Sequence, residues 1–217
     1  MIAGLVLAAG RSTRFGGDKL TAMLGAQPVV RWSVSALQEM SAVYVVVGIV
    51  SDGVRAALDG LDVVFVENPV RDEGMASSIR AGIAALPDTV EAVVIALGDQ
   101  PLISPHVIRQ VRARWRAADC AAVIAEYTDG RGHPVLFGRE CFSALAEVHG
   151  EVGARAVLMQ LAGQVAVVSV NSKIPIDVDT WAALERVSVQ AQTGRMTGDW
   201  AVNGDPLALN IASGKLP

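Results

Sequence analysis

The sequence predicts an α/β fold of three layers, with a mostly parallel sheet between two layers of helices. Short apolar runs alternate along the chain with segments of helical periodicity, and this alternation is typical of parallel sheets. Several runs are apolar at every position instead of at every second one, as expected for strands buried on both faces. The chain has 217 residues, 52% of them hydrophobic, which is enough for one domain with a complete core.

The positions of strands and helices follow from these patterns. Seven apolar runs are predicted as strands: Ile2–Leu7, Val43–Gly48, Val63–Val66, Ala92–Leu97, Ala121–Ala125, Val135–Phe137 and Val165–Val170. Apolar residues at helical spacing predict three helices between them: Val30, Val34 and Leu37; Met75, Ile79, Ile83 and Leu86; Ile108, Val111 and Trp115. Ser104 and Pro105 are predicted as the N-cap and the first-turn proline of the third helix.

Charge and cysteine usage exclude several classes of protein. The net charge of -4 leaves no basic surplus for duplex nucleic acid. Cys120 and Cys141 fit neither a disulfide framework nor a CxxC metal site, so we expect two buried thiols in a reducing compartment. The sequence shows no secretion-signal pattern and no apolar run of the roughly 18 residues that a membrane span needs. We therefore expect a soluble, cytoplasmic protein without nucleic-acid or membrane partners.

The segment LAAGRSTRFGGDKL, residues 7–20, follows the first predicted strand and is called the first loop below. Ligands of such sheets bind beyond the carboxyl ends of the strands. Its glycines allow tight turns and a close approach of backbone N–H groups to a ligand. Its three cations, Arg11, Arg14 and Lys19, favour a phosphate cradle over a flexible surface turn. Neither the G-x-G-x-x-G fingerprint nor the P-loop pattern is present.

Carboxylates at two further places are candidate metal ligands. Asp99 ends an apolar strand, where a carboxylate must be paired or bind a cation, although it could also cap the turn before Pro101. Asp177 and Asp179 lie two residues apart, on the same side of an extended segment. Asp179 is favoured as the second ligand of Mg²⁺, with Asp177 the alternative. Asp179 or Thr180 could instead be only the N-cap of the last helix.

Two smaller features are candidate ligand contacts. Ser77 and Ser78 lie in the first turn of a predicted helix, where hydroxyls and free N–H groups suit a ribose or a base edge, or serve as ordinary caps. His133 precedes Pro134, which favours extended backbone. Contact with an acceptor and a structural role are equally open for this histidine.

Residues 7–19 resemble the signature loop of nucleotidyltransferases related to the molybdenum cofactor enzymes, and above all the molybdenum cofactor cytidylyltransferases. Five further segments resemble the family in the same order: Glu67-Asn68-Pro69 with Glu73–Gly82, Asp99-Gln100-Pro101, Gly132–Phe137, Gly150–Arg155 and Asp177–Thr180. Two departures occur, since Glu151 replaces the usual Asp and the Pro-Glu-Asp expected after Thr180 is missing. The resemblance covers about residues 2 to 187.

The resemblance implies a Rossmann-like nucleotidyltransferase fold for residues 1–187, followed by a C-terminal extension, 188–217. Its implied reaction moves CMP from CTP to the phosphate of molybdopterin and releases pyrophosphate, with Mg²⁺ or Mn²⁺. The implied catalytic residues are Arg14, Lys19 and Asp99, with Asp99 and Asp179 as metal ligands. The implied nucleotide-binding residues are Leu7, Ala8, Ala9, Gly10, Arg11, Ser12, Gly16, Lys19, Asn68, Gly74, Ser77 and Ser78. The implied acceptor-binding residues are Gln100, Pro101, His133 and Pro134.

Other functions remain open at this point. The chain could be a guanylyltransferase for the same cofactor, or a transferase with another phosphorylated acceptor. It could also be a non-catalytic carrier that delivers the cofactor to an apo molybdenum hydroxylase. The guanylyl branch typically reads L-A-G-G where this chain has Leu7-Ala8-Ala9-Gly10, and the Ala9 methyl narrows the space for a purine. CTP is therefore expected over GTP. Residues 188–217 have weak periodicity and could pack on the domain, on a neighbouring subunit, or form a loosely held tail.

Overall fold

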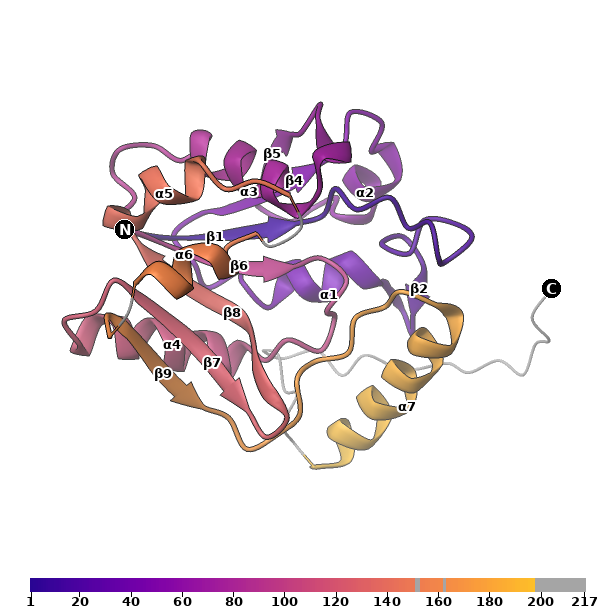
Figure 1. The fold of residues 1–217 in the computed structure, drawn as a ribbon. Helices are drawn as coiled ribbons and strands as arrows, with labels where there is room; N and C mark the ends of the chain where they lie inside the picture. Colours follow the sequence, from indigo (N-terminus) through magenta and orange to yellow (C-terminus); the bar gives the residue numbers. More distant parts are fainter. Residues whose placement is uncertain (151–152, 162, 198–217) are drawn as a thin grey trace, which may run out of the picture.

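A central sheet of seven strands organises the protein (Figure 1). The structure, a computed structural model, describes residues 1–150, 153–161 and 163–197. The strands are β1 Ile2–Leu7, β4 Val43–Val47, β5 Val64–Glu67, β6 Ala92–Leu97, β7 Ala122–Tyr127, β8 Gly130–Gly138 and β9 Val165–Ser169. Their order is β5-β4-β1-β6-β8-β7-β9, and all of these strands except β8 run in one direction. The predicted mostly parallel sheet is confirmed, with a strand at each of the seven predicted places.

Strand β8 is longer than the apolar run that predicted it. The prediction covered Val135–Phe137, whereas β8 spans Gly130–Gly138. Its first four residues are exposed or only partly buried, and there it pairs only with the end of β7, from Ala125 to Tyr127. An apolar run marks only the part of a strand that is buried in the core.

Helices cover both faces of the sheet (Figure 1). The helices are α1 Val29–Ser35, α2 Asp52–Ala57, α3 Met75–Ala84, α4 Pro105–Ala117, α5 Phe142–Ala146, α6 Arg155–Gln160 and α7 Trp181–Thr197, with 3-10 turns η1 Arg71–Glu73 and η2 Arg139–Cys141. A short hairpin joins β2 Met23–Leu24 to β3 Gln27–Pro28. The three predicted helices correspond to α1, α3 and α4. Ser104 takes the predicted N-cap place of α4, with Pro105 after it, but makes no side-chain capping bond.

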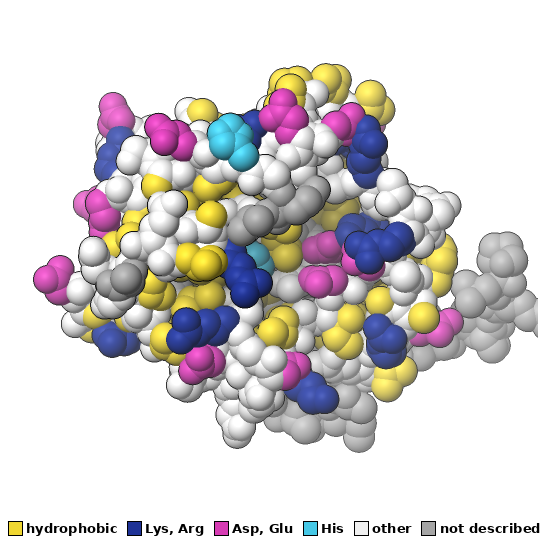
Figure 2. All heavy atoms as spheres, viewed as in Figure 1, with side chains coloured by type: hydrophobic (Ala, Val, Ile, Leu, Met, Phe, Trp, Pro, Cys, Tyr) yellow, Lys and Arg dark blue, Asp and Glu magenta, His cyan; other side chains and the backbone are white. Residues whose placement is uncertain are grey.

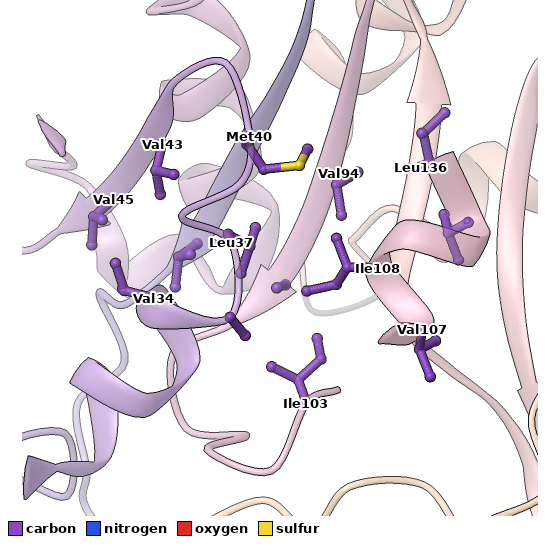
Figure 3. Packing of buried hydrophobic residues seen from close by; sticks show 14 of the residues in the cluster. Val34, Leu37, Met40, Val43, Val45, Val94, Ile103, Val107, Ile108 and Leu136 are labelled. Atoms are coloured by element: carbon purple, nitrogen blue, oxygen red, sulfur yellow. The ribbon is translucent and has the colours of Figure 1, made fainter. Parts of the chain in front are cut away.

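The core consists of one apolar layer on each face of the sheet, because successive strand residues point to opposite sides. On one face, α1, α2 and α4 pack against the strands. Figure 3 shows this layer, in which Leu37 and Met40 face Val94 and Ile108. The other face carries α3, α5 and α6. Gly82 allows a close approach of α3 on this face, since a Cβ at this position would lie 2.5 Å from Leu5 Cδ1.

A third, smaller apolar cluster lies beside α7 and matters for the site. It joins residues of the first loop, the β2–β3 hairpin, the start of α1 and α7: Phe15, Leu24, Val29, Leu102, Val178, Leu184 and Val187. Helix α7 runs through the predicted domain boundary at residue 188, and residues 198–217 lie outside the described part of the chain. The predicted extension therefore stays a prediction.

Two expectations about composition can be compared with the structure. Both cysteines are free; Cys141 is buried as expected, but Cys120 is only partly buried. No helix within the described ranges is long and apolar enough to cross a membrane.

Candidate active site

The first loop leaves the carboxyl end of β1 and is closed by its own hydrogen bonds. Ser12 has a positive φ of 54°, and its Oγ accepts a hydrogen bond from the Lys19 backbone N at 3.3 Å. Gly16 has a φ of 75°, a conformation that favours glycine. Phe15 is buried, and its ring centroid lies 4.5 Å from that of Trp181 on α7. Phe15 therefore anchors the loop, while the parts of the loop before and after Phe15 remain at the edge of the sheet.

A cavity of about 470 Å³ opens above this edge. Its wall is formed by Leu7, Ala8, Ala9, Gly10, Arg11, Ser12, Thr13, Arg14, Lys19, Leu20, Arg71, Asp72, Gly74, Met75, Ser78, Leu97, Asp99 and Asp179. Figure 2 shows Lys or Arg side chains beside Asp or Glu side chains on the face over the ends of β1 and β6. The structure thus brings twelve of the predicted site residues into one cavity: Leu7, Ala8, Ala9, Gly10, Arg11, Ser12, Arg14, Lys19, Gly74, Ser78, Asp99 and Asp179.

Lys19 joins the two candidate metal ligands. Its Nζ donates to Asp99 Oδ2 at 2.5 Å and to Asp179 Oδ1 at 2.6 Å. The Lys19 side chain is only 10% exposed, against 19% for Asp99 and 34% for Asp179. The segment with Asp179 is held beside Asp99 by the Val178 N–H, which donates to the Asp99 carbonyl at 2.9 Å. Residues 160 positions apart in the chain therefore meet at one ammonium group.

The charges at this point perturb one another. Burial lowers the pKa of Lys19, but the charges of Asp99 and Asp179 and their hydrogen bonds outweigh it, so that its pKa lies above the ordinary value. The hydrogen bond from Lys19 holds the pKa of Asp179 below its ordinary value. Partial burial, and then the nearby Asp99, raise the pKa of Asp177. The Asp177 side chain is bound to Gln100, whose Nε2 donates to Asp177 Oδ1 at 2.8 Å.

The donor set fits a hard divalent cation. Within the described ranges no cluster of three or more His, Cys, Asp or Glu side chains could hold a metal. Mg²⁺ and similar ions, however, are commonly held by one or two carboxylates plus phosphate oxygens and waters. Asp99 and Asp179 already turn one oxygen each toward a single cation, the Lys19 ammonium. Two carboxylates therefore face a common point in the cavity wall.

The remaining predicted cations are also paired with carboxylates. Arg14 Nη2 lies 3.1 Å from Asp179 Oδ2, and Arg11 forms an ion pair with Asp72. Both arginines are more than half exposed at the rim of the cavity. Exposed pairs of this kind contribute little to stability, so an incoming anion can replace the carboxylates at little cost.

The second predicted loop is organised by Asn68. Its Nδ2 donates to Ser77 Oγ at 2.8 Å and to Ser78 Oγ at 3.0 Å, and its Oδ1 accepts from the Val70 N–H. Ser77 in turn donates to the Gly74 carbonyl at 2.8 Å, where Gly74 has a φ of 89°. Gly74 and Ser78 line the cavity, whereas Asn68 and Ser77 are buried outside its wall.

The predicted acceptor residues lie outside the wall of this cavity, as does Gly16. Gln100 and Pro101 are buried. His133 Nδ1 lies 3.2 Å from the Ile95 carbonyl, which can only accept, so this nitrogen carries the proton. Burial lowers the pKa of His133, which favours the neutral ring. Their contact with an acceptor stays a prediction.

The structure also adds residues that the sequence reasoning missed. Arg71, Asp72 and Met75 also line the cavity. Arg71 and Asp72 stand between the two halves of the second resemblance, from Pro69 to Glu73. Their charges, in this short gap between two family-like segments, were the sequence signal that could have identified Arg71 and Asp72 as site residues.

Comparison with family models gives one match, a MobA-like NTP transferase domain over residues 4–165. The molybdenum cofactor guanylyltransferase of Rhizobium leguminosarum bv. trifolii is 33% identical over 139 residues, which cover 62% of this chain and 61% of that protein. The bifunctional protein GlmU of Geobacter metallireducens is 32% identical over 142 residues, 64% of this chain. The matched part of this chain spans only 29% of that GlmU.

Solved structures share the fold. Rv0371c from Mycobacterium tuberculosis superposes with a TM-score of 0.76 at 33% identity, covering 87% of this chain and 97% of that one. A further structure of Rv0371C is a complex with manganese, with a TM-score of 0.71. A nucleotidyl transferase from Methanothermobacter thermautotroptrophicus, 24% identical, gives a TM-score of 0.74 over 89% of this chain and 99% of that one. The predicted Rossmann-like, three-layer fold is thereby confirmed.

Proposed function

Because the chain belongs to the family of MobA-like NTP transferase domains, we propose that it transfers CMP from CTP to the phosphate of molybdopterin and releases pyrophosphate. The observation that carries the proposal is the meeting of Lys19 with Asp99 and Asp179 in the wall of the cavity that the first loop borders. A buried ammonium and two carboxylates beside a cationic, glycine-rich loop suit a polyphosphate and its counter-ion.

The chemistry is an in-line attack of the acceptor phosphate on the α-phosphorus of the NTP. The bond from the α-phosphorus to the bridging oxygen breaks, and pyrophosphate leaves with that electron pair. Catalysis of such a transfer consists mainly of positioning and charge neutralisation. The amides of the first loop, with Arg11 and Arg14, hold the β- and γ-phosphates. Lys19 stabilises charge on the α-phosphoryl group and the leaving pyrophosphate. The reaction needs no covalent enzyme intermediate.

Asp99 and Asp179 are the residues that would hold Mg²⁺ or Mn²⁺. When bound, the ion supplies neutralisation of the phosphate charge. The Lys19 ammonium contacts both carboxylates, so it would lie beside the same phosphates as the ion.

Nucleotide choice in the proposal rests on Ala9 and on the resemblance to the cytidylyl branch. Ala9 is buried in the cavity wall, so its methyl takes up space that a glycine would leave open. The Ser77–Ser78 turn could supply groups that match cytosine, and Ser78 faces the cavity.

A guanylyltransferase is the second candidate, because a relative from Rhizobium is named "Molybdenum cofactor guanylyltransferase" and relatives from Pyrococcus and Thermococcus are named "Probable molybdenum cofactor guanylyltransferase". The similarity to GlmU keeps a transferase with another phosphorylated acceptor as a third. A carrier that hands the finished cofactor to an apo molybdenum hydroxylase is the alternative outside enzymes.

Pyrophosphate release measured with each NTP, with and without molybdopterin, separates these functions. The proposal requires release with CTP that depends on molybdopterin. Release with GTP alone would support the guanylyltransferase. Turnover that needs a different phosphorylated acceptor would show that molybdopterin is not the acceptor. Binding of the molybdenum cofactor without turnover of any NTP would support the carrier.

A further inference from the structure

Arg71 is a cavity-lining cation that the proposed phosphate chemistry does not use. It lies in η1 and shares the cavity with Arg11, Arg14 and Lys19. Each of those three is bound to a carboxylate. Arg71 has no ion pair with any residue in the described ranges, although Asp72 follows it directly and Glu73 comes next. A cation left without a carboxylate in a cavity wall is available to a ligand.

The position of the Arg71 guanidinium depends on Gly48. This glycine follows β4 directly, and a Cβ built on it would lie 2.5 Å from Arg71 Nη1, 3.1 Å from Cδ and 3.2 Å from Cζ. Any larger residue would therefore push the end of the Arg71 side chain away. The φ of Gly48 is not in the left-handed region, so the missing side chain, and not backbone freedom, is what the position requires.

Arg71 and Lys19 occupy opposite ends of the cavity. The guanidinium lies over the end of β4, whereas Asp99, the partner of Lys19, follows β6. Strand β1 lies between β4 and β6, so two strand spacings, about 10 Å, separate these ends. On the Arg71 side the wall is completed by Gly74, Met75 and Ser78. A nucleotide with its phosphates at Lys19 would therefore extend its base toward Arg71.

We propose that Arg71 binds the nucleobase and that Gly48 positions its guanidinium to do so; this inference rests on the NTP binding proposed above. A guanidinium presents parallel N–H donors in a planar fork, which suits two neighbouring acceptors. Cytosine offers such a pair, O2 and N3. Guanine offers one as well, O6 and N7, so the fork suits either base and does not by itself choose between them.

Direct binding measurements on Arg71→Met test the inference. Isothermal titration with CTP and with inorganic tripolyphosphate, both with Mg²⁺, separates the base end from the phosphate end. We expect about ten- to hundredfold weaker CTP binding, as for loss of hydrogen bonds from a charged donor, and unchanged tripolyphosphate binding. GTP binding should weaken as well, because guanine also offers two neighbouring acceptors. Arg71→Lys keeps the charge without the fork and should not restore CTP binding.

Gly48→Ala tests the same contact without changing any charge. Its Cβ displaces the guanidinium, so CTP binding should weaken while tripolyphosphate binding is retained. Arg109→Met is the matched control, because Arg109 is an exposed arginine of α4 that pairs with Glu39, outside the cavity wall. Far-ultraviolet circular dichroism checks that each variant is folded. Should Gly48→Ala fail to fold, Arg71→Met decides alone.

Two results would overturn the assignment of Arg71 to the base and leave the proposed function intact. Equal CTP affinity in the wild type and Arg71→Met would remove Arg71 from the binding site. A matching loss of tripolyphosphate affinity would make Arg71 a phosphate ligand. A third result, a wild type that binds no NTP, would overturn the proposed function together with this inference.

Discussion

Lys19→Met tests whether Asp99 and Asp179 form a cation site. In the wild type the ammonium lies 2.5 and 2.6 Å from their oxygens, with Lys19 only 10% exposed. The substitution leaves two carboxylates facing each other, with only the exposed Arg14 beside Asp179. Removing one partner of a buried ion pair costs about 3–5 kcal/mol, and the partial exposure of Asp179 reduces this. We expect a loss of about 2–3 kcal/mol in the free energy of unfolding, or about 4–12 °C in Tm for a domain of this size.

The loss in the free energy of unfolding of Lys19→Met depends on pH, and this dependence follows from the directions in which the pKa values of Lys19 and Asp179 are shifted. The raised pKa of Lys19 means that its contribution is complete below its ordinary value of 10.5 and is lost as pH rises through the folded-state pKa. The lowered pKa of Asp179 means that its contribution is complete above 3.8 and is lost as pH falls through the folded-state pKa. The wild-type ion pair is therefore fully effective at neutral pH. In Lys19→Met the deficit should shrink in acid, because protonation of one carboxylate removes the repulsion.

Thermal melting followed by circular dichroism, at neutral and acid pH in EDTA and then at neutral pH in Mn²⁺, measures these effects. Mn²⁺ should raise the Tm of Lys19→Met more than that of the wild type, because no ammonium competes with it and binding to the folded state stabilises by mass action. Lys173→Met, at an exposed position, is the control and should melt like the wild type. An unchanged Tm of Lys19→Met in EDTA, or a larger Mn²⁺ effect on the wild type, would refute the reasoning.

Three further outcomes are expected. Asp99→Asn should lower turnover by orders of magnitude while the protein stays folded, because its charge acts at the reacting phosphates; near-normal pyrophosphate release would contradict this. EDTA should abolish activity and Mg²⁺ or Mn²⁺ should restore it, whereas activity that survives complete chelation would exclude a metal role for the carboxylates. With molybdopterin as acceptor, kcat/KM should be higher for CTP than for GTP, and Ala9→Gly should shift the ratio toward GTP by about 1–3 kcal/mol; equal values in the wild type, or a preference for GTP, would show that cytidylyl transfer is the wrong assignment.

Local sequence patterns did not predict every element of the fold. Helices α2, α5 and α6 have only five or six residues each, too few for an apolar period to stand out. The polar half of β8 was missed because backbone pairing with β7, and not burial, makes it a strand. Helix α3 was visible in the sequence, but the hydrogen bonds of Asn68 that set its first turn join residues up to ten positions apart.

The sequence by itself determined where the buried strands lie, because a strand covered on both faces must be apolar along its length. The sequence also showed Gly, Arg and Lys on the loop after β1. This loop could be assigned to the ligand-binding edge of the sheet, because the carboxyl ends of parallel strands share one edge. Only the tertiary structure decided which side chains meet there. Asp179 reaches Lys19 because Val178 is buried in the cluster beside α7 and its N–H bonds to the Asp99 carbonyl, and Arg71 enters the cavity because Gly48 leaves room. Both contacts join segments far apart in the chain, so they depend on packing that no local pattern of residues specifies.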